Sequence, residues 1–483
     1  MFKHSFLFLA AAAYVGSAAA ENKHLHHHLD DRRIQDYPAL YESVPAPLPS
    51  ADIPSPPAGT VALNDSELQQ RPDLIKRALN AALLYNHAGN AAELLPFYRN
   101  LPEEQRDADT LEWAEAAAAR SQNRPREAVR RYRKLAAAHS ELLPLRFQLA
   151  LALFENNEWE AAGQQFEKLR SEKDLPSDIA ALLDRYLAAI RNQSRWQIYG
   201  GVSYLHDPNI NNAPANSNLG GGFTAPAAES AQGIGLSAGI GKRHILPHGF
   251  FAEARADGST RYYWDNKKYS EASLRLSAGG GFQDARHTVS LMPFAEQSWY
   301  AGGRKDGQNM KRFSHNTGLS ADWSYRFSAN WQSRLSAEYA RQRYRTRTHL
   351  NGHSLSASAL LYYTPNAKQY WFAGIDGSKT ATRSDDDAYN RRGIRAGWGQ
   401  EWPLGLSTRL NLGYGQRRYQ GINFFNIVQR NKEYSAQVSV WHRAVHFYGI
   451  TPRLTWSYHK NKGNHPLYLH QKQRVFVELG KQF

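Results

Sequence analysis

The sequence predicts an α plus transmembrane-β protein: an N-terminal helical-repeat domain followed by an antiparallel outer-membrane β-barrel of about 14 strands. Three observations support this prediction. The chain opens with a segment typical of secretion signals, a 34-residue period runs through its first half, and apolar and polar residues alternate in the remainder. We expect a signal peptide at residues 1–20, a His- and Pro-rich tail at 21–64, the helical domain at 65–193 and the barrel at 194–483.

The N-terminal segment resembles a cleaved secretion signal. Lys3 and His4 precede an apolar run at residues 6–15, and three alanines precede Glu21. This order is typical of a signal peptide, and the run is too short to cross a hydrocarbon core of about 30 Å as a helix. We therefore expect the mature chain to act outside the cytoplasm. Because the sequence contains no cysteine, we expect no lipid-anchored N-terminus, disulfide framework or thiolate chemistry.

The composition fits a membrane barrel. The mean hydropathy is −0.63, and no later stretch approaches the roughly 18 apolar residues that a spanning helix needs. Barrel strands alternate lipid-facing and lumen-facing side chains, so a low mean hydropathy is typical of them. The formal net charge of +15 would also suit a nucleic-acid binder. We expect no nucleic acid as a partner, because the charge is scattered and an exported protein rarely meets nucleic acid.

Residues 22–59 are predicted to form a solvated tail. The run Lys23-His24-Leu25-His26-His27-His28 is followed by a segment rich in proline between residues 45 and 57. Proline at this density removes backbone donors and favours extended chain. The histidines could chelate a metal ion, but no carboxylate lies at a fixed spacing from them. We therefore favour a solvated tail over a metal site.

A 34-residue period organises the helical domain. The aromatic residues Tyr98, Tyr132 and Phe166 recur at this step (132 − 98 = 34 and 166 − 132 = 34). This is the period of a tetratricopeptide helix pair. The second helix of each pair resembles that family's signature in Ala128-x-x-x-Tyr132 and Ala162-x-x-x-Phe166. The small residue admits the neighbouring helix, and the aromatic residue fills the space beside it.

The number of repeats follows from the turns. Asn123 and Asn157 are one period apart and predict the turns between paired helices. The earliest unit departs from the pattern, because Leu94 stands where alanine is expected. We predict two clear repeats, one degenerate repeat before them and a closing helix near residues 176–192. The recurring aromatic residues serve packing, so we expect any binding on the concave side that such stacks offer to polypeptides.

Period-two alternation begins after about residue 195. In residues 406–415 the even positions are apolar or Thr and the odd positions are small or polar, and residues 272–278 alternate in the same way. This pattern, repeated with turns between, is typical of membrane barrels. A soluble sandwich would also alternate, but it needs no interfacial aromatic residues. Such residues are abundant here, at positions 262–264, 299–300, 362–363, 370–371, 398, 402 and 441.

Counting candidate strands gives about 14, an even number as a bacterial barrel requires. The predicted strands start near Trp196, Ala231, Phe250, Tyr269, His287, Arg312, Asn330, Gly352, Lys368, Tyr389, Gly405, Lys432, Phe447 and Lys472. Tight turns alternate with long connections, which lie at residues 206–230, 301–311, 420–431 and 461–471. Outer-membrane barrels place short turns in the periplasm and long loops outside, so this order leaves the helical domain in the periplasm.

The chain ends in an alternating segment. Leu479, Val477 and Val475 share one face with the terminal Phe483, although Lys481 interrupts that face. A terminal aromatic residue on such a strand resembles the signal that the barrel-insertion machinery reads. We therefore expect Phe483 to serve as this C-terminal signal.

The sequence contains no motif of a known catalytic class. A P-loop, a metal-spaced His-Glu set and a nucleophile elbow are all absent. His206-Asp207, His442 and His446 could belong to a barrel hydrolase with a serine nucleophile. Isolated histidines on strands are more often girdle or lumen residues, and no orienting group is paired with these. We expect no enzyme, no cofactor and no bound metal, which leaves a conduit or an assembly factor.

From about residue 65 onward the chain resembles the surface lipoprotein assembly modulator (Slam) family. The likeness is carried by LALALFENN at residues 149–157, RAGWGQEW at 395–402, WHRAVHFYGITPRL at 441–454 and RVFVELGKQF at 474–483. The resemblance implies a translocator that delivers lipid-anchored proteins from the periplasm to the cell surface. It also implies clients of the host iron or haem acquisition type or the immune-evasion type.

For such a protein we expect the helical domain to hold an incompletely folded client while Arg275, Arg409 and Arg417 line a polar, cationic lumen path. Folding of the client outside would draw it across. Expected partners are the lipoprotein client, outer-membrane lipids, the barrel-insertion machinery during biogenesis and periplasmic chaperones. The alternative is an exopolysaccharide export porin with tetratricopeptide repeats, although the short repeat array and the arginines argue against it. A nutrient porin would leave the repeats unused.

Overall fold

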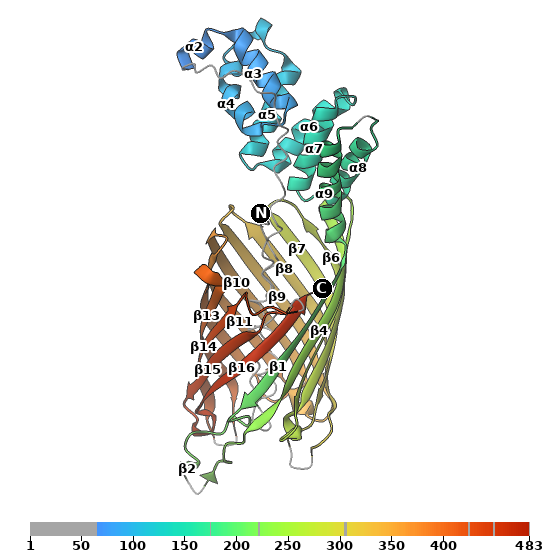
Figure 1. Cartoon of the computed structure of the whole chain (residues 1–483). Helices are drawn as coiled ribbons and strands as arrows, with labels where there is room; N and C mark the ends of the chain where they lie inside the picture. The colour runs from blue at the N-terminus through green and yellow to red at the C-terminus, as the bar shows by residue number, and fades with distance from the viewer. Residues whose placement is uncertain are drawn as a thin grey trace.

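The computed structural model describes residues 65–173, 175–220, 223–303, 307–423, 426–447 and 450–482. The expected signal peptide, the His- and Pro-rich tail and Phe483 lie outside these residues. A stack of helices stands at one end of a tall β-barrel (Figure 1), and α9 (Ser177–Gln193) leads directly into β1 (Trp196–Asp207). The structure therefore confirms the predicted fold class of helical repeats followed by a closed antiparallel barrel.

The α-helices before α9 are α2 (Asp65–Gln69), α3 (Pro72–Leu84), α4 (Ala88–Arg99), α5 (Ala108–Ser121), α6 (Pro125–Ala138), α7 (Leu143–Glu155) and α8 (Trp159–Arg170). They form three helix pairs, α3 with α4, α5 with α6 and α7 with α8, and α9 closes the stack. None of the helices in the described ranges is long and apolar enough to cross a membrane.

Asparagines in the left-handed conformation form the turns within the pairs. Asn86, Asn123 and Asn157 have φ values of 60°, 56° and 60°, and asparagine tolerates this conformation better than most residues. Asn123 and Asn157 are thus at the turns where the sequence predicts them. The turn at Asn86 was not predicted, because it lies 37 residues before Asn123 (123 − 86 = 37) and so falls off the repeat period.

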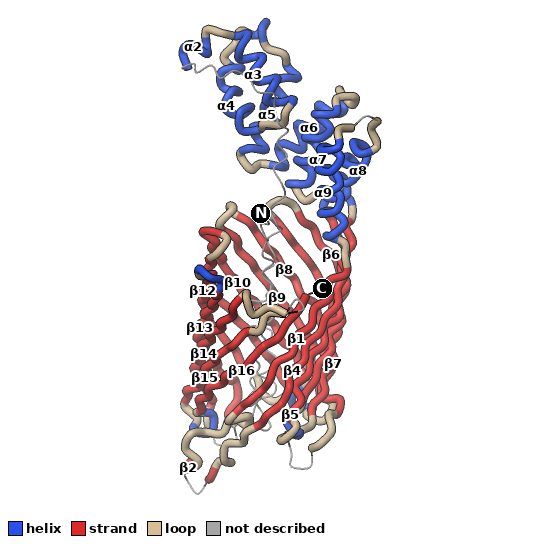
Figure 2. The backbone as a smooth tube through the Cα atoms, viewed as in Figure 1, coloured by secondary structure: helices blue, strands red, loops and turns tan. Residues whose placement is uncertain are grey.

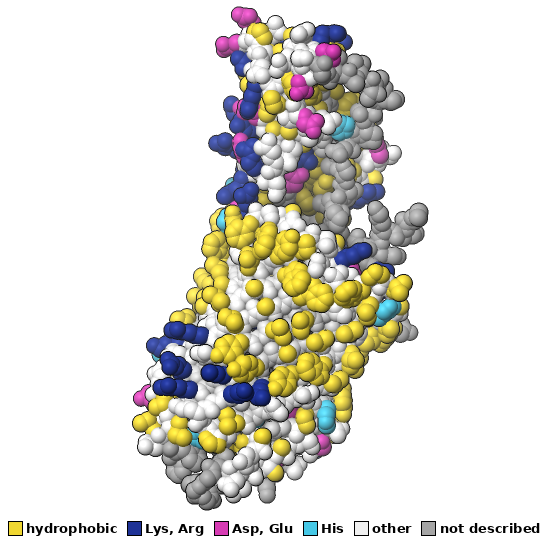
Figure 3. Space-filling model, turned by 90° about the vertical axis from the view of Figure 1, so that its left-hand side faces the viewer, with side chains coloured by type: hydrophobic (Ala, Val, Ile, Leu, Met, Phe, Trp, Pro, Cys, Tyr) yellow, Lys and Arg dark blue, Asp and Glu magenta, His cyan; other side chains and the backbone are white. Residues whose placement is uncertain are grey.

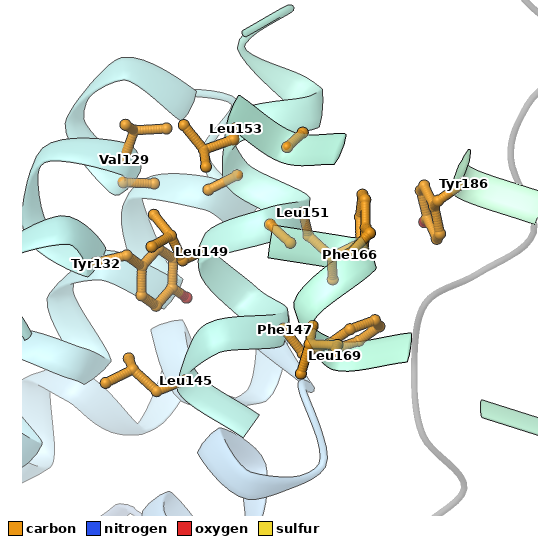
Figure 4. Packing of buried hydrophobic residues seen from close by; sticks show 14 of the residues in the cluster. Val129, Tyr132, Leu145, Phe147, Leu149, Leu151, Leu153, Phe166, Leu169 and Tyr186 are labelled. Atoms are coloured by element: carbon orange, nitrogen blue, oxygen red, sulfur yellow. The ribbon is translucent and has the colours of Figure 1, made fainter. Parts of the chain in front are cut away.

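The repeat residues lie inside two hydrophobic cores. Tyr132 and Phe166 are fully buried, and Ala128 and Ala162 are buried in the same core, part of which Figure 4 shows. Tyr98 is buried in the core of the first helix pair. The ring of Phe166 also stacks on Tyr186 of α9, with ring centroids 4.9 Å apart. The closing helix therefore covers the exposed end of the last repeat, as a capping element must.

Replacing Tyr132 by alanine should destabilise the helical domain by about 3–5 kcal/mol, because the change leaves a cavity in a fully buried site. Denaturant titration of the mature protein in detergent, followed by circular dichroism at the helix band, measures this change. Leu84→Ala is the matched control, since Leu84 is 48% exposed, and it should cost below about 1 kcal/mol. An unchanged transition in Tyr132→Ala would contradict the assigned packing role.

The barrel contains β1 and β4–β16, each hydrogen-bonded to its neighbour, with β16 returning to β1. The strands after β1 are β4 (Ala231–Ile245), β5 (Phe250–Tyr263), β6 (Glu271–Gln283), β7 (His287–Tyr300), β8 (Lys311–Arg326), β9 (Trp331–Tyr344), β10 (Gly352–Asn366), β11 (Gln369–Thr382), β12 (Tyr389–Glu401), β13 (Leu406–Ile422), β14 (Val428–His442), β15 (Arg453–Gly463) and β16 (His470–Gln482). A small hairpin of β2 (Asn218–Gly220) and β3 (Phe223–Thr224) belongs to the first long loop.

Two predicted strand starts are wrong by more than two residues. β14 begins at Val428 rather than near Lys432, and β15 begins at Arg453 rather than near Phe447. Residues 443–447 and 450–452, which the structure describes, lie outside both strands, and an isolated bridge joins Phe447 to Ile450. Pro452 has no amide hydrogen to donate to a ladder, so the strand starts after it. This periplasmic turn is consequently longer than the others.

Alternate residues of each strand face the lipid and the lumen. Exposed apolar side chains such as Leu355, Ile375 and Leu412 occupy the lipid-facing positions. Figure 3 shows hydrophobic side chains gathered in a band on one face of the barrel. The Asp and Glu residues of the strands all occupy the opposite, inward set of positions. This distribution is that of an outer-membrane barrel, and it places the helical domain on the periplasmic side, where the turns are short.

Candidate functional site

The barrel interior carries paired charges. Ion pairs join Arg243 to Glu253 at 2.8 Å, Arg275 to Glu338 at 2.7 Å, Arg334 to Asp322 at 3.0 Å and Arg417 to Glu433 at 2.9 Å. Arg275 on β6 reaches Glu338 on β9 across two intervening strands, which is feasible only for side chains that converge inside the barrel. The lumen wall is therefore polar and contains both signs of charge.

The three arginines predicted to line the path lie on inward-facing positions. The guanidinium of Arg275 lies 3.5 Å from the ring centroid of Phe294. That of Arg417 lies 4.7 Å from the ring centroid of Tyr389, and Arg409 is buried as well. Because carboxylates neutralise Arg275 and Arg417, these residues make the wall polar without giving it a net positive charge. Their part in client passage stays a prediction.

The seam between the first and last strands is the least paired junction of the barrel. β1 and β16 are in register over five residue pairs, from Tyr199 with Gln482 to Ser203 with Glu478. On its other side β1 pairs with β4 over 12 residue pairs, from Trp196 with Lys242 to Asp207 with Ala231. The five pairs lie at the periplasmic end of β16, so backbone pairing stops before the extracellular half of the seam.

An ion-pair latch bridges this extracellular half. Asp207 is 1% exposed, and its carboxylate lies 3.2 Å from Lys472 Nζ and 3.5 Å from an Arg474 side-chain nitrogen. Lys472 Nζ also donates to Asn212 Oδ1 at 2.8 Å. Continuing the register beyond Ser203 and Glu478 would set Asp207 opposite Arg474. Side-chain charges thus hold the strands together where backbone hydrogen bonds do not, and we call Asp207, Lys472 and Arg474 the seam latch.

Sequence reasoning missed the seam latch. Asp207 was considered only beside His206 as a hydrolase candidate, and 265 residues separate it from Lys472. A usable signal was present, because Lys472 and Arg474 share the inward positions of a terminal strand whose outward positions carry Val475 and Val477. Closure of the barrel brings these residues together, and a single sequence does not reveal its register.

The histidines considered for a hydrolase make local contacts. His206 lies exposed on β1. His442 Nδ1 accepts the Ala444 amide at 3.1 Å, and His446 Nδ1 lies 2.9 Å from Thr451 Oγ1. The last two contacts stabilise the β14–β15 turn.

The helical domain is joined to one side of the periplasmic rim. Asn157 Nδ2 donates to the backbone oxygen of Asp284 at 2.7 Å, and Arg126 lies 3.5 Å from the Asp284 carboxylate. Asp284 belongs to the turn between β6 and β7, and its side chain also accepts the Arg286 amide at 2.8 Å. Figure 2 shows α6–α9 above this side of the rim. The helices therefore stand beside the lumen entrance, between β1 and the β6–β7 turn of the rim.

These features define a class of protein: an outer-membrane barrel that carries a short periplasmic array of tetratricopeptide-type repeats. Comparison with known proteins identifies the family. The family model described as surface lipoprotein assembly modifier matches residues 196–483 of this chain. The family model of the N-terminal TPR repeats of the same proteins matches residues 61–166. The chain belongs to the surface lipoprotein assembly modifier family. The predicted family is thereby confirmed, and this is a family of assembly factors rather than of enzymes.

Curated relatives match over nearly the full chain. Surface lipoprotein assembly modifier 1 of Haemophilus influenzae is 43% identical and covers 99% of this chain and 98% of its own length. The surface lipoprotein assembly modifier of Pasteurella multocida is 40% identical, covering 94% and 92%. The hemophilin secretion modulator of Acinetobacter baumannii is 25% identical, covering 86% and 87%.

Proposed function

We propose that this chain moves a lipid-anchored client from the periplasmic face of the outer membrane to the cell surface, and that the barrel wall opens at the β1–β16 seam during transfer. The helical domain would hold the incompletely folded client at the rim. The observation that carries this proposal is that, within the described part of the chain, β1 pairs with β16 over five residue pairs, fewer than β15 and β16 make with each other.

The lipid anchor is the reason for a lateral opening. Burial of acyl groups in a membrane is favourable by about 0.8 kcal/mol per CH₂, so drawing a chain of about 16 carbons into a polar lumen would cost on the order of 12 kcal/mol. The anchor can avoid this cost by staying in the bilayer while the polypeptide crosses through the lumen. That route requires a gap in the wall through which the two remain connected.

The seam is where such a gap disturbs the fewest backbone hydrogen bonds. Unpaired backbone groups in contact with lipid cost several kcal/mol each, so strands of a membrane barrel separate at the shortest ladder first. At the extracellular half the seam latch must part, and so must the hydrogen bonds from Lys472 to Asn212 and from the Ala215 amide to the Leu469 backbone oxygen. The charged groups of the latch can then be hydrated by the opened lumen. The paired charges elsewhere on the wall make the lumen polar, so a polar polypeptide can lie in it without losing its hydrogen-bond partners.

The client class is proposed from similarity and from the requirement for energy. One relative is named for the secretion of hemophilin, which supports a client involved in haem or iron acquisition, with immune-evasion lipoproteins as the second candidate class. No nucleotide is available in the periplasm, so folding of the client outside would retain it there. The barrel-insertion machinery and periplasmic chaperones would act as partners before and during this transfer.

Co-expression with candidate lipoproteins tests the proposed function. In a Gram-negative host that lacks the family, the full chain should make one client lipoprotein accessible to protease added to intact cells. Without the chain, the same lipoprotein should stay protected while still acylated. A periplasmic lipoprotein unrelated to surface display is the matched control and should stay protected in both strains. Protection of every candidate client, together with a correctly inserted barrel, would contradict the proposal.

The alternative function, an exopolysaccharide export porin, predicts the opposite result in these strains. Such a porin would increase polymer release and leave lipoproteins where they are. Measuring released polysaccharide in the same strains separates the two functions.

A further inference from the structure

A cluster of cations on the lipid-facing wall is not explained by lipoprotein transfer. The side chains face outward from the extracellular ends of five consecutive strands. They are Lys379 on β11, Arg392 on β12, Arg418 on β13, Arg430 and Lys432 on β14, and Lys460 and Lys462 on β15. We call these seven residues the outer cationic patch. Figure 3 shows Lys and Arg gathered beside the apolar band, on the side away from the helical domain.

Strand register arranges these cations in rows. Arg392 is opposite Gln416, which is opposite Lys432, which is opposite Lys462. The next row toward the outside joins Lys379, Asn390, Arg418 and Arg430. Neighbouring strands lie about 4.8 Å apart and alternate residues about 6.6 Å apart. The patch therefore extends about 19 Å around the barrel, a size that suits one lipid headgroup.

The patch borders the hydrocarbon region directly. The row on its periplasmic side contains Ile394, Tyr414 and Tyr434, followed by Lys460. Tyrosines at this height are typical of the interface between hydrocarbon and headgroups. Lys460 lies in the tyrosine row, and the other six cations lie one or two rows farther toward the outside, on the headgroup side of the tyrosines.

The protein itself does not neutralise these cations. Every Asp and Glu of the strands faces the lumen, and among the described residues none of the seven takes part in an ion pair. The helical domain contrasts with this arrangement, because its exposed Arg99 lies 2.6 Å from Glu115. A merely solvated charged surface would be expected to mix both signs in the same way. Uniform positive charge instead calls for an external anion.

An apolar hollow lies next to the patch. It measures about 880 Å³ on the outer wall of β9–β15. Small outward side chains form its floor, namely Ala373, Ala396 and Ala436, and Ile394, Tyr414 and Tyr434 border it toward the cations. A ligand with phosphate groups and acyl chains would place each part against matching chemistry.

We propose that the outer cationic patch and this hollow form a binding site for a phosphorylated glycolipid of the outer leaflet. The phosphates would contact Arg392, Lys432 and Lys462 in the inner row, and an acyl chain would occupy the hollow. The lipid anchor of a client carries acyl chains but no phosphate, so it would use the hollow without the cations. The charge of the patch favours the phosphorylated lipid as the occupant.

Binding of a purified bisphosphorylated lipopolysaccharide to the mature full-length protein in zwitterionic detergent tests the site. A four-site variant should bind at least about tenfold more weakly, since each cation near an anionic lipid surface contributes to the free energy of binding. Its substitutions are Arg392→Gln, Arg418→Gln, Lys432→Gln and Lys462→Gln. The matched control removes four exposed cations from the helical domain, by Arg77→Gln, Arg130→Gln, Lys173→Gln and Arg185→Gln, and should bind as the parent does. Heat-modifiable migration on gels verifies that each barrel is folded.

Two outcomes would overturn the proposal. One is equal binding of the same lipopolysaccharide after its phosphates are removed. The other is unchanged affinity in the four-site variant, and if that variant also lost client binding, the patch would be a polypeptide site. If the four-site variant fails to fold, Lys432→Gln with Lys462→Gln should lower affinity about threefold, and Lys432→Arg with Lys462→Arg should retain it.

Discussion

An engineered disulfide across the β1–β16 seam should reduce client display at least about tenfold when oxidised, and reduction should restore display. The substitutions are Ser203→Cys and Glu478→Cys, which lie opposite each other in register. Residues opposed in an antiparallel pair have Cα separations of about 4.5–5.5 Å, within the range that a disulfide spans. The chain contains no other cysteine, so the engineered pair is the only thiol pair that can be oxidised.

The physical reason for this large effect is that the cross-link removes the opening itself. The Glu478 substitution removes one hydrogen bond of the lumen wall, which Thr455 Oγ1 donates at 3.1 Å, and it does so in the reduced and the oxidised protein alike. The helical domain and the seam latch stay in place, so client capture should continue. Client should therefore accumulate at the periplasmic face, where cross-linking or co-purification with the oxidised protein would detect it.

A second disulfide provides the control. Ser259→Cys with Ser273→Cys joins β5 to β6, where the two hydroxyl oxygens are already 2.9 Å apart and the strands pair over a long ladder. Oxidation there should leave display unchanged. Normal display by the oxidised seam variant would show that client leaves by another route, and equal loss in both variants would point to general rigidity.

Deleting residues 65–193 should leave a membrane-inserted barrel that displays less than about one-tenth of the client displayed by the full chain. The strands are hydrogen-bonded to one another around a closed ring, so the barrel does not depend on the helices for its backbone pairing. The helices supply the polypeptide-binding surface that a repeat stack offers. Without them the client should fold in the periplasm before it reaches the lumen.

Heat-modifiable migration and protease protection of intact cells provide the measurements for the deletion. A double variant, Arg126→Ala with Asn157→Gly, keeps the helical domain, because glycine also adopts the left-handed conformation of Asn157. It removes the two side-chain contacts to Asp284 at the rim. It should lose less display than the deletion, because α9 still tethers the stack to β1. Normal display by the deleted protein would refute the holding role.

The repeat architecture could be predicted because packing imposes a strict spacing on the sequence. Tyr132 and Phe166 had to recur at a fixed step to fill equivalent spaces, and both are fully buried. Strand alternation was equally readable, since a membrane barrel must separate lipid-facing from lumen-facing residues. The start of β15 was predicted wrongly, because Val445 and Phe447 continue an apolar pattern although they are exposed in a turn.

The seam and the charge pairing could not be predicted in the same way. Arg275 and Arg417 were recognised as polar positions, but their partners Glu338 and Glu433 are set by curvature and register rather than by local pattern. The length of the β1–β16 ladder also depends on how the ring closes. A single sequence describes each strand, whereas these features belong to the relation between strands.

The direct connection of α9 to β1 has a mechanical consequence. Ser194 and Arg195 are the only residues between the closing helix and the strand that borders the seam. A lateral force on the helical stack is therefore transmitted to the periplasmic end of β1. This end is close to Tyr199 and Gln482, the pair of the seam that lies nearest the periplasm. Such a load peels hydrogen bonds apart one after another instead of straining all of them together. The pull of a bound polypeptide would therefore act on the junction between the two strands that are joined by the shortest ladder.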